Sequence, residues 1–354
     1  MSSTPVVAIT GMNATDNPAP GVAVARSLRE APGFNGTIVG LGYDALDPGF
    51  YAKGLLDAAA IMPFPSAGRD ATLHRLLEVQ SRFGLDVLIP TLDSELRAVA
   101  ALEPELRAAK IATLVPRIDS VDAASKPRLN ELGAKAGFPV PESEAISTAS
   151  AIPRLVGQFG LPIVIKGVFY GASIVYTEAD AVQAFHHFVA SWGLPVIVQR
   201  FIKGEEYNVA GLGDGRGNTI GAVAMRKMAL TEKGKGWAGV TIDDERLVEV
   251  TERVVGALNW RGGLEVEFIK DSDGEKVYVA EVNPRFPAWV HLATAAGQNL
   301  AAACVDLALG QPVEKMRGYR VGTMFVRISI DQIAELERFG RIASTGLADL
   351  EEHA

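Results

Sequence analysis

Five polar side chains stand at alternate positions in two neighbouring segments of the chain: Glu265, Glu267, Glu281, Asn283 and Arg285. Successive side chains of a β-strand point to opposite faces, so residues two apart share a face. Carboxylate and amide oxygens suit Mg²⁺, whose shell is completed by waters and substrate phosphates. The spacing therefore predicts a magnesium site with Arg285 beside it. The alternative is a solvated face on which Arg285 serves as the counter-ion.

Two strands of a hairpin would position these residues. Residues 264–269 and 276–283 have strand-like patterns, and Asp273-Gly274 between them is a strong turn signal. We therefore expect an antiparallel pair that closes at this turn.

The length of the turn decides which acids face each other. A loop of residues 273–275 places Glu267 opposite Glu281, whereas a loop longer by two residues places Glu265 there. In either register, carboxylates gather on one face. Because like charges destabilise a ladder, such a cluster favours a bound cation.

These residues carry a resemblance to a known family. Glu267, followed after fourteen residues by Glu281-Val282-Asn283-Pro284-Arg285, resembles the metal-binding signature of the ATP-grasp superfamily. The carbamoyl-phosphate-synthetase-type and amino-acid-ligase branches are the most similar. The resemblance implies that Glu267, Glu281 and Asn283 hold two Mg²⁺ ions, which Mn²⁺ can replace, against ATP. It also implies that Arg285 assists acyl-phosphate chemistry.

Two lysines are expected near the phosphates. Ser125-Lys126-Pro127 and the residues after it resemble the start of the family's ATP-binding domain, with Ser125 where Asp is usual, and this gives Lys126 a phosphate-contacting role. Lys166 ends a predicted strand at 161–166, and a glycine-containing turn to Ser173 follows. Backbone N–H groups of such a turn can cradle phosphate oxygens. The resemblance implies that Gly171 and Ser173 belong to a lid over the phosphates.

The adenosine contacts are expected in the next strand, residues 196–202. By resemblance, backbone groups of Gln199 and Arg200 bind the adenine, on which Phe201 packs. Glu206, seven residues after Gln199, would hold the ribose hydroxyls.

The first 120 residues alternate strands and helices. Predicted strands at 6–11, 37–42 and 86–90, with a helix at 71–83, indicate a parallel sheet. A dinucleotide site is disfavoured because Gly11 does not begin a G-x-G-x-x-G motif. The segment resembles instead the Rossmann-like leading domain of ATP-grasp ligases.

Candidate substrate contacts lie in two further segments. In the loop before residue 95, Asp93 and Glu95 either read a substrate amine or begin the helix that follows. Residues 225–240 are expected to form a long polar loop in which Arg226 and Lys235 bind an anionic substrate. A single helix is expected at 289–308.

Composition excludes several classes of function. The chain has 354 residues, a net charge of −8 and no clustered basic segment, which argues against nucleic-acid binding. Its single cysteine, Cys304, is expected to be a buried small residue, and this cysteine usage suits a reducing cytoplasm. No run approaches the roughly 18 apolar residues of a membrane span, and the start of the chain does not resemble a signal peptide. His291 is expected to pack, and His186-His187 lack metal-ligand partners at a matching spacing.

The sequence thus predicts an α/β protein with a Rossmann-like leading domain and a two-lobed ATP-grasp fold. The expected divisions are the leading domain, a small lobe, a large lobe and a C-terminal tail: residues 1–120, 121–195, 196–330 and 331–354. The expected function is that of an ATP-dependent carboxylate–amine ligase acting through an acyl phosphate on small molecules, and the resemblance allows a homodimer. The alternatives are a carbamoyl-phosphate-synthetase-like enzyme that phosphorylates a carboxylate, and a non-catalytic ATP-binding subunit.

Overall fold

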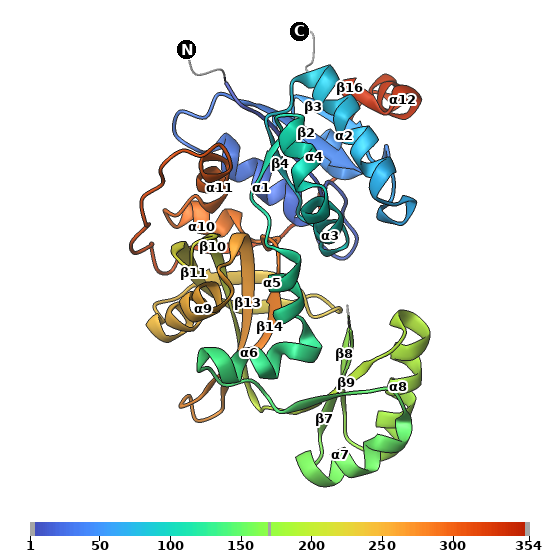
Figure 1. Cartoon of the computed structure of the whole chain (residues 1–354), viewed down its shortest axis with the longest axis vertical. Helices are drawn as coiled ribbons and strands as arrows, with labels where there is room; N and C mark the ends of the chain where they lie inside the picture. Colours follow the sequence, from blue (N-terminus) through green and yellow to red (C-terminus); the bar gives the residue numbers. More distant parts are fainter. Residues whose placement is uncertain (1–3, 169–170, 351–354) are drawn as a thin grey trace. The chain divides into compact units, whose positions relative to one another are not determined.

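A computed structural model describes residues 4–168 and 171–350 of the chain (Figure 1). The chain divides into two compact units, each built from segments that are distant in the sequence. The first unit contains Met1–Ser120, Asn208–Glu265 and Asn283–Ala354, and the second contains Val121–Tyr207 and Val266–Val282.

A mostly parallel sheet lies in the first unit, with the strand order β16-β3-β2-β1-β4-β5. Its parallel strands are β1 (Val6–Ile9), β2 (Thr37–Gly42), β3 (Ala58–Ile61), β4 (Val87–Ile89) and β5 (Ala112–Thr113). The parallel sheet expected from the alternation of strands and helices is therefore confirmed. Strand β3 has the sequence AAAI and was not expected, because alanine is a poor strand former.

Helices alternate with these strands along the chain. They are α1 (Pro20–Arg29), η1 (Pro48–Tyr51), η2 (Pro65–Ala67), α2 (Arg69–Phe83), α3 (Asp93–Ala101), α4 (Glu103–Ala108) and α5 (Ile118–Ala123). The helix expected at 71–83 is α2, which ends at Gly84 with a positive φ of 73°. Glycine adopts this left-handed conformation without strain, so it stops the helix there.

The C-terminal segment contains a helix and a strand. Helix α12 (Leu336–Thr345) leads into β16 (Leu347–Asp349), which pairs antiparallel with β3. Arg75 also donates a 2.7 Å hydrogen bond to the carbonyl oxygen of Gly346. These contacts are distant in sequence, which is why a local pattern did not indicate them. Residues 351–354 lie outside the described residues.

The second unit contains an antiparallel sheet with the order β6-β9-β7-β8. Its strands are β6 (Ser143–Ile146), β7 (Ile163–Gly167), β8 (Ala172–Val175) and β9 (Val196–Arg200). The accompanying helices are η3 (Lys126–Arg128), α6 (Leu129–Ala136), η4 (Ala149–Ala151), α7 (Ile152–Phe159) and α8 (Glu178–Trp192). Helices α7 and α8 pack on the sheet and bury an apolar core that includes Ile165, Phe185 and Val198.

A third sheet has the order β14-β13-β10-β11-β12-β15. Its strands are β10 (Gly204–Asp214), β11 (Thr219–Leu230), β12 (Gly236–Thr241), β13 (Arg261–Asp271), β14 (Val277–Asn283) and β15 (Met324–Val326). The expected hairpin is confirmed as β13 and β14. At its turn the Asp271 N–H donates to the Lys276 carbonyl at 3.1 Å, and Gly274 has a φ of 70°.

Two expectations for this half of the chain are wrong. Residues 225–240 are not a long loop, because β11 and β12 pair antiparallel with Met225 opposite Thr241. The helix expected at 289–308 is two helices, α10 (His291–Ala295) and α11 (Leu300–Ala308). The break follows from Gly297, whose φ of 109° is not helical, and from Asn299, whose side chain caps α11.

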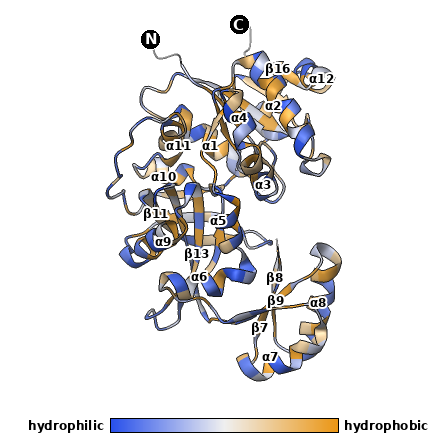
Figure 2. Ribbon diagram, in the orientation of Figure 1, coloured by the Kyte–Doolittle hydropathy of each residue, from blue (hydrophilic) through white to orange (hydrophobic). Residues whose placement is uncertain are grey.

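Helix α9 (Glu245–Leu258) is amphipathic and precedes the hairpin. Leu247, Val250 and Val254 are buried on one face, and Figure 2 shows hydrophobic and hydrophilic residues on this helix.

Candidate active site

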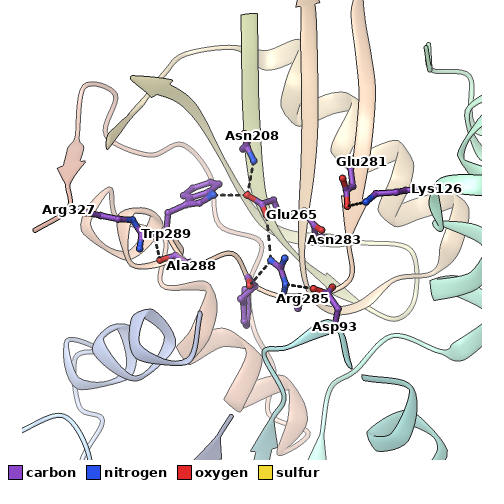
Figure 3. Close-up of polar contacts among 11 residues, drawn as sticks. Asp93, Lys126, Asn208, Glu265, Glu281, Asn283, Arg285, Ala288, Trp289 and Arg327 are labelled. Carbon is purple, nitrogen blue, oxygen red and sulfur yellow. Dashed lines mark hydrogen bonds and ion pairs between the residues drawn. The ribbon is translucent and has the colours of Figure 1, made fainter. Parts of the chain in front are cut away.

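An ion pair in the second unit joins two of the expected site residues. Lys126 lies in η3, and its Nζ is 3.2 Å from Oε1 of Glu281 on β14 (Figure 3). The Lys126 side chain is only 11% exposed, whereas that of Glu281 keeps 27% of its surface. The Glu281 carboxylate is therefore held by a lysine, and part of the Glu281 side chain remains exposed.

Lys166, at the end of β7, interacts with the same group of residues. Burial lowers the pKa of its ammonium group, the Glu281 carboxylate raises it, and the Lys126 ammonium lowers it further. Glu267 and Glu206 also act on this pKa through their charges. Both expected lysines and three of the expected acids therefore belong to one electrostatic cluster within the second unit.

The pKa of Glu281 is raised within this cluster. Burial raises its pKa above the ordinary value of 4.5, Lys126 opposes that shift, and the neighbouring Glu267 adds to it. Burial and a second carboxylate both raise the pKa of this carboxyl group, which disfavours its anionic form. A divalent cation would stabilise that anionic form.

The two glutamates of β13 have different partners. Glu267 interacts with Glu281, whereas Glu265 accepts a 3.1 Å hydrogen bond from Nδ2 of Asn283. These contacts match the register in which Glu267, and not Glu265, stands opposite Glu281.

Arg285 is held by two carboxylates in the first unit. Its Nε donates to Oδ2 of Asp93 at 3.1 Å, and its Nη1 lies 3.6 Å from Oε2 of Glu265 (Figure 3). Asp93 is the first residue of α3, whose N-cap position is Leu92 without a side-chain cap. Asp93 thus begins the helix, as one of the two expected alternatives had it, and its carboxylate also contacts Arg285.

Glu95 lies on the same helix but has other contacts. Its carboxylate accepts hydrogen bonds from the hydroxyl groups of Thr10, at 2.5 Å, and Tyr43. Its side chain is buried, and this burial raises the pKa of Glu95 to about 7. Burial and the nearby Glu95 carboxylate also raise the pKa of Tyr43.

The residues expected to bind adenosine lie on and after β9, the second strand of its sheet. Gln199 is buried and Phe201 is half-buried, while Arg200 forms a 3.1 Å ion pair with Glu142. Glu206 is exposed on β10, and its charge acts on Lys166.

The expected phosphate lid is described only in part. Gly171 has a positive φ of 86°, and Ser173 is on β8, but residues 169–170 lie outside the described residues. Gly167 donates its N–H to the carbonyl oxygen of Gly171 at 3.2 Å, which closes the turn after Lys166.

The β11–β12 hairpin carries the two expected anion-binding residues. Arg226 is exposed on β11, and Lys235 is exposed at the turn before β12. Burial of part of its surface lowers the pKa of Lys235, Asp16 raises it, and Arg285 lowers it further. Lys235 and Arg285 therefore interact.

Other candidate groups have structural roles. Across residues 4–168 and 171–350, no group of three or more His, Cys, Asp or Glu side chains could hold a metal ion. His291 pairs with Glu30 at 2.8 Å, and Cys304 is buried, which raises the pKa of its thiol to about 12. Both match their expected packing. In the described part of the chain, the helices are too short or too polar to cross a membrane.

Some site residues were not identified from the sequence. Asn208 and Trp289 both donate to Glu265, and Thr10 and Tyr43 both donate to Glu95. These partners lie 24 to 85 residues from the acids they contact. No local spacing could have indicated them.

Comparison with known proteins decides the family of the central part of the chain. Residues 123–288 match the model of the ATP-grasp domain family. The chain contains an ATP-grasp domain. This confirms the resemblance seen in Glu267, Glu281, Asn283 and Arg285. The cluster of Lys126, Lys166 and the acids of the second unit lies inside the matched residues.

Two curated proteins are similar to the ATP-grasp domain and its surroundings. The carbamoyl phosphate synthase large chain of Agathobacter rectalis is 25% identical over 222 residues, which cover 58% of this chain and 20% of that protein. The D-alanine--D-alanine ligase of Chromohalobacter salexigens is 26% identical over 173 residues, which cover 45% of this chain and 54% of the ligase. The matches thus span a fifth of the first relative and about half of the second.

Solved structures share the fold of nearly the whole chain. The biotin carboxylase domain of Hydrogenobacter thermophilus 2-oxoglutarate carboxylase, a dimer with MgADP, ADP and bicarbonate, has a TM-score of 0.69 and 16% identity. The match covers 90% of this chain and 72% of that one. An N5-carboxyaminoimidazole ribonucleotide synthetase in complex with ADP has a TM-score of 0.67 and 16% identity. This match covers 88% of this chain and 79% of the synthetase. The expected α/β fold around the ATP-grasp domain is therefore confirmed.

Proposed function

We propose that the chain is an ATP-dependent carboxylate–amine ligase that forms an amide bond through an acyl phosphate. The observation that carries this proposal is the cluster of Lys126, Lys166, Glu206, Glu267 and Glu281 inside the ATP-grasp domain. Positive groups for phosphates and paired acids for cations are the parts that phosphoryl transfer needs. The similar D-alanine--D-alanine ligase and the MgADP complex of the biotin carboxylase domain support the proposal.

In this proposal Glu267 and Glu281 hold two Mg²⁺ ions, or Mn²⁺ in their place. The side-chain amide oxygen of Asn283, two residues beyond Glu281 on β14, is a third ligand. The raised pKa of Glu281 supports this assignment, because a divalent cation would stabilise two neighbouring carboxylates. When bound, these ions neutralise charge on the phosphates of ATP.

The nucleotide is bound by other residues of the second unit. Lys126 and Lys166 contact phosphate oxygens, and Gly171 and Ser173 cover them. A further group binds the nucleoside: backbone groups of Gln199 and Arg200, the ring of Phe201 and the carboxylate of Glu206. Exposure of Glu206 on β10 leaves its carboxylate accessible to ribose hydroxyls.

The reaction begins when a substrate carboxylate oxygen attacks the γ-phosphorus of ATP. A new bond forms between this oxygen and the γ-phosphorus, which gives the acyl phosphate. The bond between the γ-phosphorus and the oxygen of the departing ADP breaks. An amine nitrogen then attacks the acyl carbon, phosphate leaves, and the two protons lost by the ammonium group go to phosphate and to solvent. The Arg285 guanidinium stabilises the oxyanion of the tetrahedral intermediate.

Several charged side chains are expected to contact the substrates. Arg285 and Lys235 supply positive charge for a carboxylate, and Arg226 would extend this surface. Asp93 supplies a carboxylate for an ammonium group. Both oxygens of Glu95 already accept hydrogen bonds from the hydroxyl groups of Thr10 and Tyr43. Glu95 therefore acts in amine recognition by positioning these two hydroxyl groups.

An ADP-release screen over amino acids and small carboxylates, with mass spectrometry of the products, tests the proposal. A ligase reaches its full rate of ADP release only when one carboxylate and one amine are both present. Mass spectrometry then detects an amide product. ADP release that needs no amine indicates the carboxylate-phosphorylating alternative. ATP binding without ADP release indicates a non-catalytic subunit. We also propose that the chain forms a homodimer and acts in the cytoplasm. Light scattering of the purified chain tests the homodimer.

A further inference from the structure

Glu265 is a buried acid held by residues of the first unit. Its Oε1 accepts hydrogen bonds from Nδ2 of Asn208 and Nε1 of Trp289, both at 2.7 Å. Its Oε2 accepts from Nδ2 of Asn283 at 3.1 Å and lies 3.6 Å from Nη1 of Arg285 (Figure 3). Only 8% of the side chain is exposed.

Such an environment accepts a carboxylate and disfavours a neutral amide. A buried carboxylate is stable only when donors surround its oxygens, and four donor groups surround Glu265. Two of them, Asn208 and Trp289, hold the carboxyl group in place. The other two belong to residues of the proposed reaction, Asn283 and Arg285.

The contact with Asn283 determines how its amide group is turned. A carboxylate only accepts hydrogen bonds, so the amide nitrogen faces Glu265 and the carbonyl oxygen is directed away from it. A cation binds the oxygen and is repelled by the nitrogen. The orientation set by Glu265 is therefore the one that lets Asn283 act as a metal ligand.

We infer that Glu265 is a positioning residue that orients the Asn283 amide and the Arg285 guanidinium. Its carboxylate contacts neither the cation nor the substrate in this account. Groups that orient metal ligands in this way commonly change metal affinity by about 10–100-fold when removed. The inference rests on the proposed function, because only there is Asn283 a cation ligand.

Glu265→Gln is the informative substitution, because glutamine has the same shape. Asn208 and Trp289 would bind the oxygen of its amide, which places its NH₂ group opposite Asn283. Two NH₂ groups cannot bond each other, so the Asn283 amide turns over and presents its nitrogen to the cation. We expect Mn²⁺ affinity, measured by the electron paramagnetic resonance of free Mn²⁺ with a non-hydrolysable ATP analogue present, to fall about 10–100-fold.

The double variant Glu265→Gln/Asn283→Asp exchanges the amide and the carboxylate. The introduced aspartate accepts from the glutamine NH₂ with one oxygen and offers the other to the cation, so Mn²⁺ affinity should return to within about threefold of the wild-type value. Glu275→Gln, on the exposed turn of the same hairpin, serves as the matched control and should bind Mn²⁺ normally.

The outcomes separate this inference from the proposed function. Unchanged Mn²⁺ affinity in Glu265→Gln, or a double variant that does not regain affinity whether or not the single variant folds, overturns the positioning role alone. A wild-type chain that binds neither Mn²⁺ nor the ATP analogue overturns the proposed function and this inference with it.

Discussion

Nζ of Lys126 and Oε1 of Glu281 lie 3.2 Å apart, in an ion pair that joins the start of the ATP-grasp domain to its last strand. The lysine thus neutralises a carboxylate that the proposed function assigns to a cation. Cation and lysine compete for the same oxygen, and a triphosphate would give the lysine another anionic partner.

Removing Lys126 should therefore have opposite effects on two ligands. In Lys126→Met, we expect Mn²⁺ to bind more tightly without nucleotide, because the competing ammonium group is gone. The KM for ATP should rise about 10-fold, because a charged hydrogen bond to phosphate is lost. Equilibrium Mn²⁺ binding and initial-rate kinetics measure the two effects, and weaker Mn²⁺ binding in this variant would contradict the competition.

Glu281 should be essential to turnover. In Glu281→Gln the loss of one charged ligand is expected to lower kcat at least about 100-fold, more than typical effects of residues that only orient a metal ligand. The matched control Glu275→Gln removes an exposed acid from the same hairpin and should leave kcat unchanged. Near-normal ADP release by Glu281→Gln would show that the metal assignment is wrong.

Lys166 should affect ATP binding in a way that depends on pH. Burial holds its pKa below the ordinary value of 10.5, so its positive charge is lost at a lower pH than that of an exposed lysine. The KM for ATP should therefore rise as the pH increases through this lowered pKa. Lys166→Met should show a high KM without that pH dependence, whereas Lys276→Met, at an exposed position, should behave as the wild-type chain.

Glu95 should make the stability of the chain depend on pH. Its pKa rises from 4.5 in the unfolded chain to about 7 in the folded one, because the carboxyl group is buried. The folded state thus binds a proton more tightly, so stability is fully present below pH 4.5 and is lost as the pH rises toward 7. The shift corresponds to about 3 kcal/mol of unfolding free energy.

Urea unfolding of the wild type and of Glu95→Gln between pH 5 and pH 8 tests this dependence. The free energy of unfolding of the wild type should fall relative to that of the glutamine variant as the pH rises, because glutamine does not titrate. A constant difference between the two proteins over this range would show that Glu95 has an ordinary pKa.

Local patterns predicted much of the fold. The alternation of apolar strands with helices gave the parallel sheet, and Asp273-Gly274 gave the hairpin that carries Glu267 and Glu281. The β11–β12 hairpin was missed because its turn, Thr231–Lys235, is polar and the end of β11 is exposed. Strand β12 also pairs with β15, which follows about ninety residues later.

The candidate site was predictable where its residues follow one motif. Glu267 and Glu281 lie on one hairpin, and their spacing predicted that they face each other in one of two possible registers. The partners of Glu265 and Arg285 come from other strands and helices, so the chain must fold before they meet. Which glutamate faces Glu281 also depended on the turn, whose length the sequence left open.

A crystal structure of the chain with Mn²⁺ and a non-hydrolysable ATP analogue tests the central claim most directly, because anomalous scattering locates the metal. We expect Mn²⁺ to be bound by carboxylate oxygens of Glu267 and Glu281 at roughly 2.0–2.3 Å, beside the phosphates and near Lys166. Mn²⁺ or nucleotide bound away from both acids, with the Lys126–Glu281 ion pair intact, would contradict it.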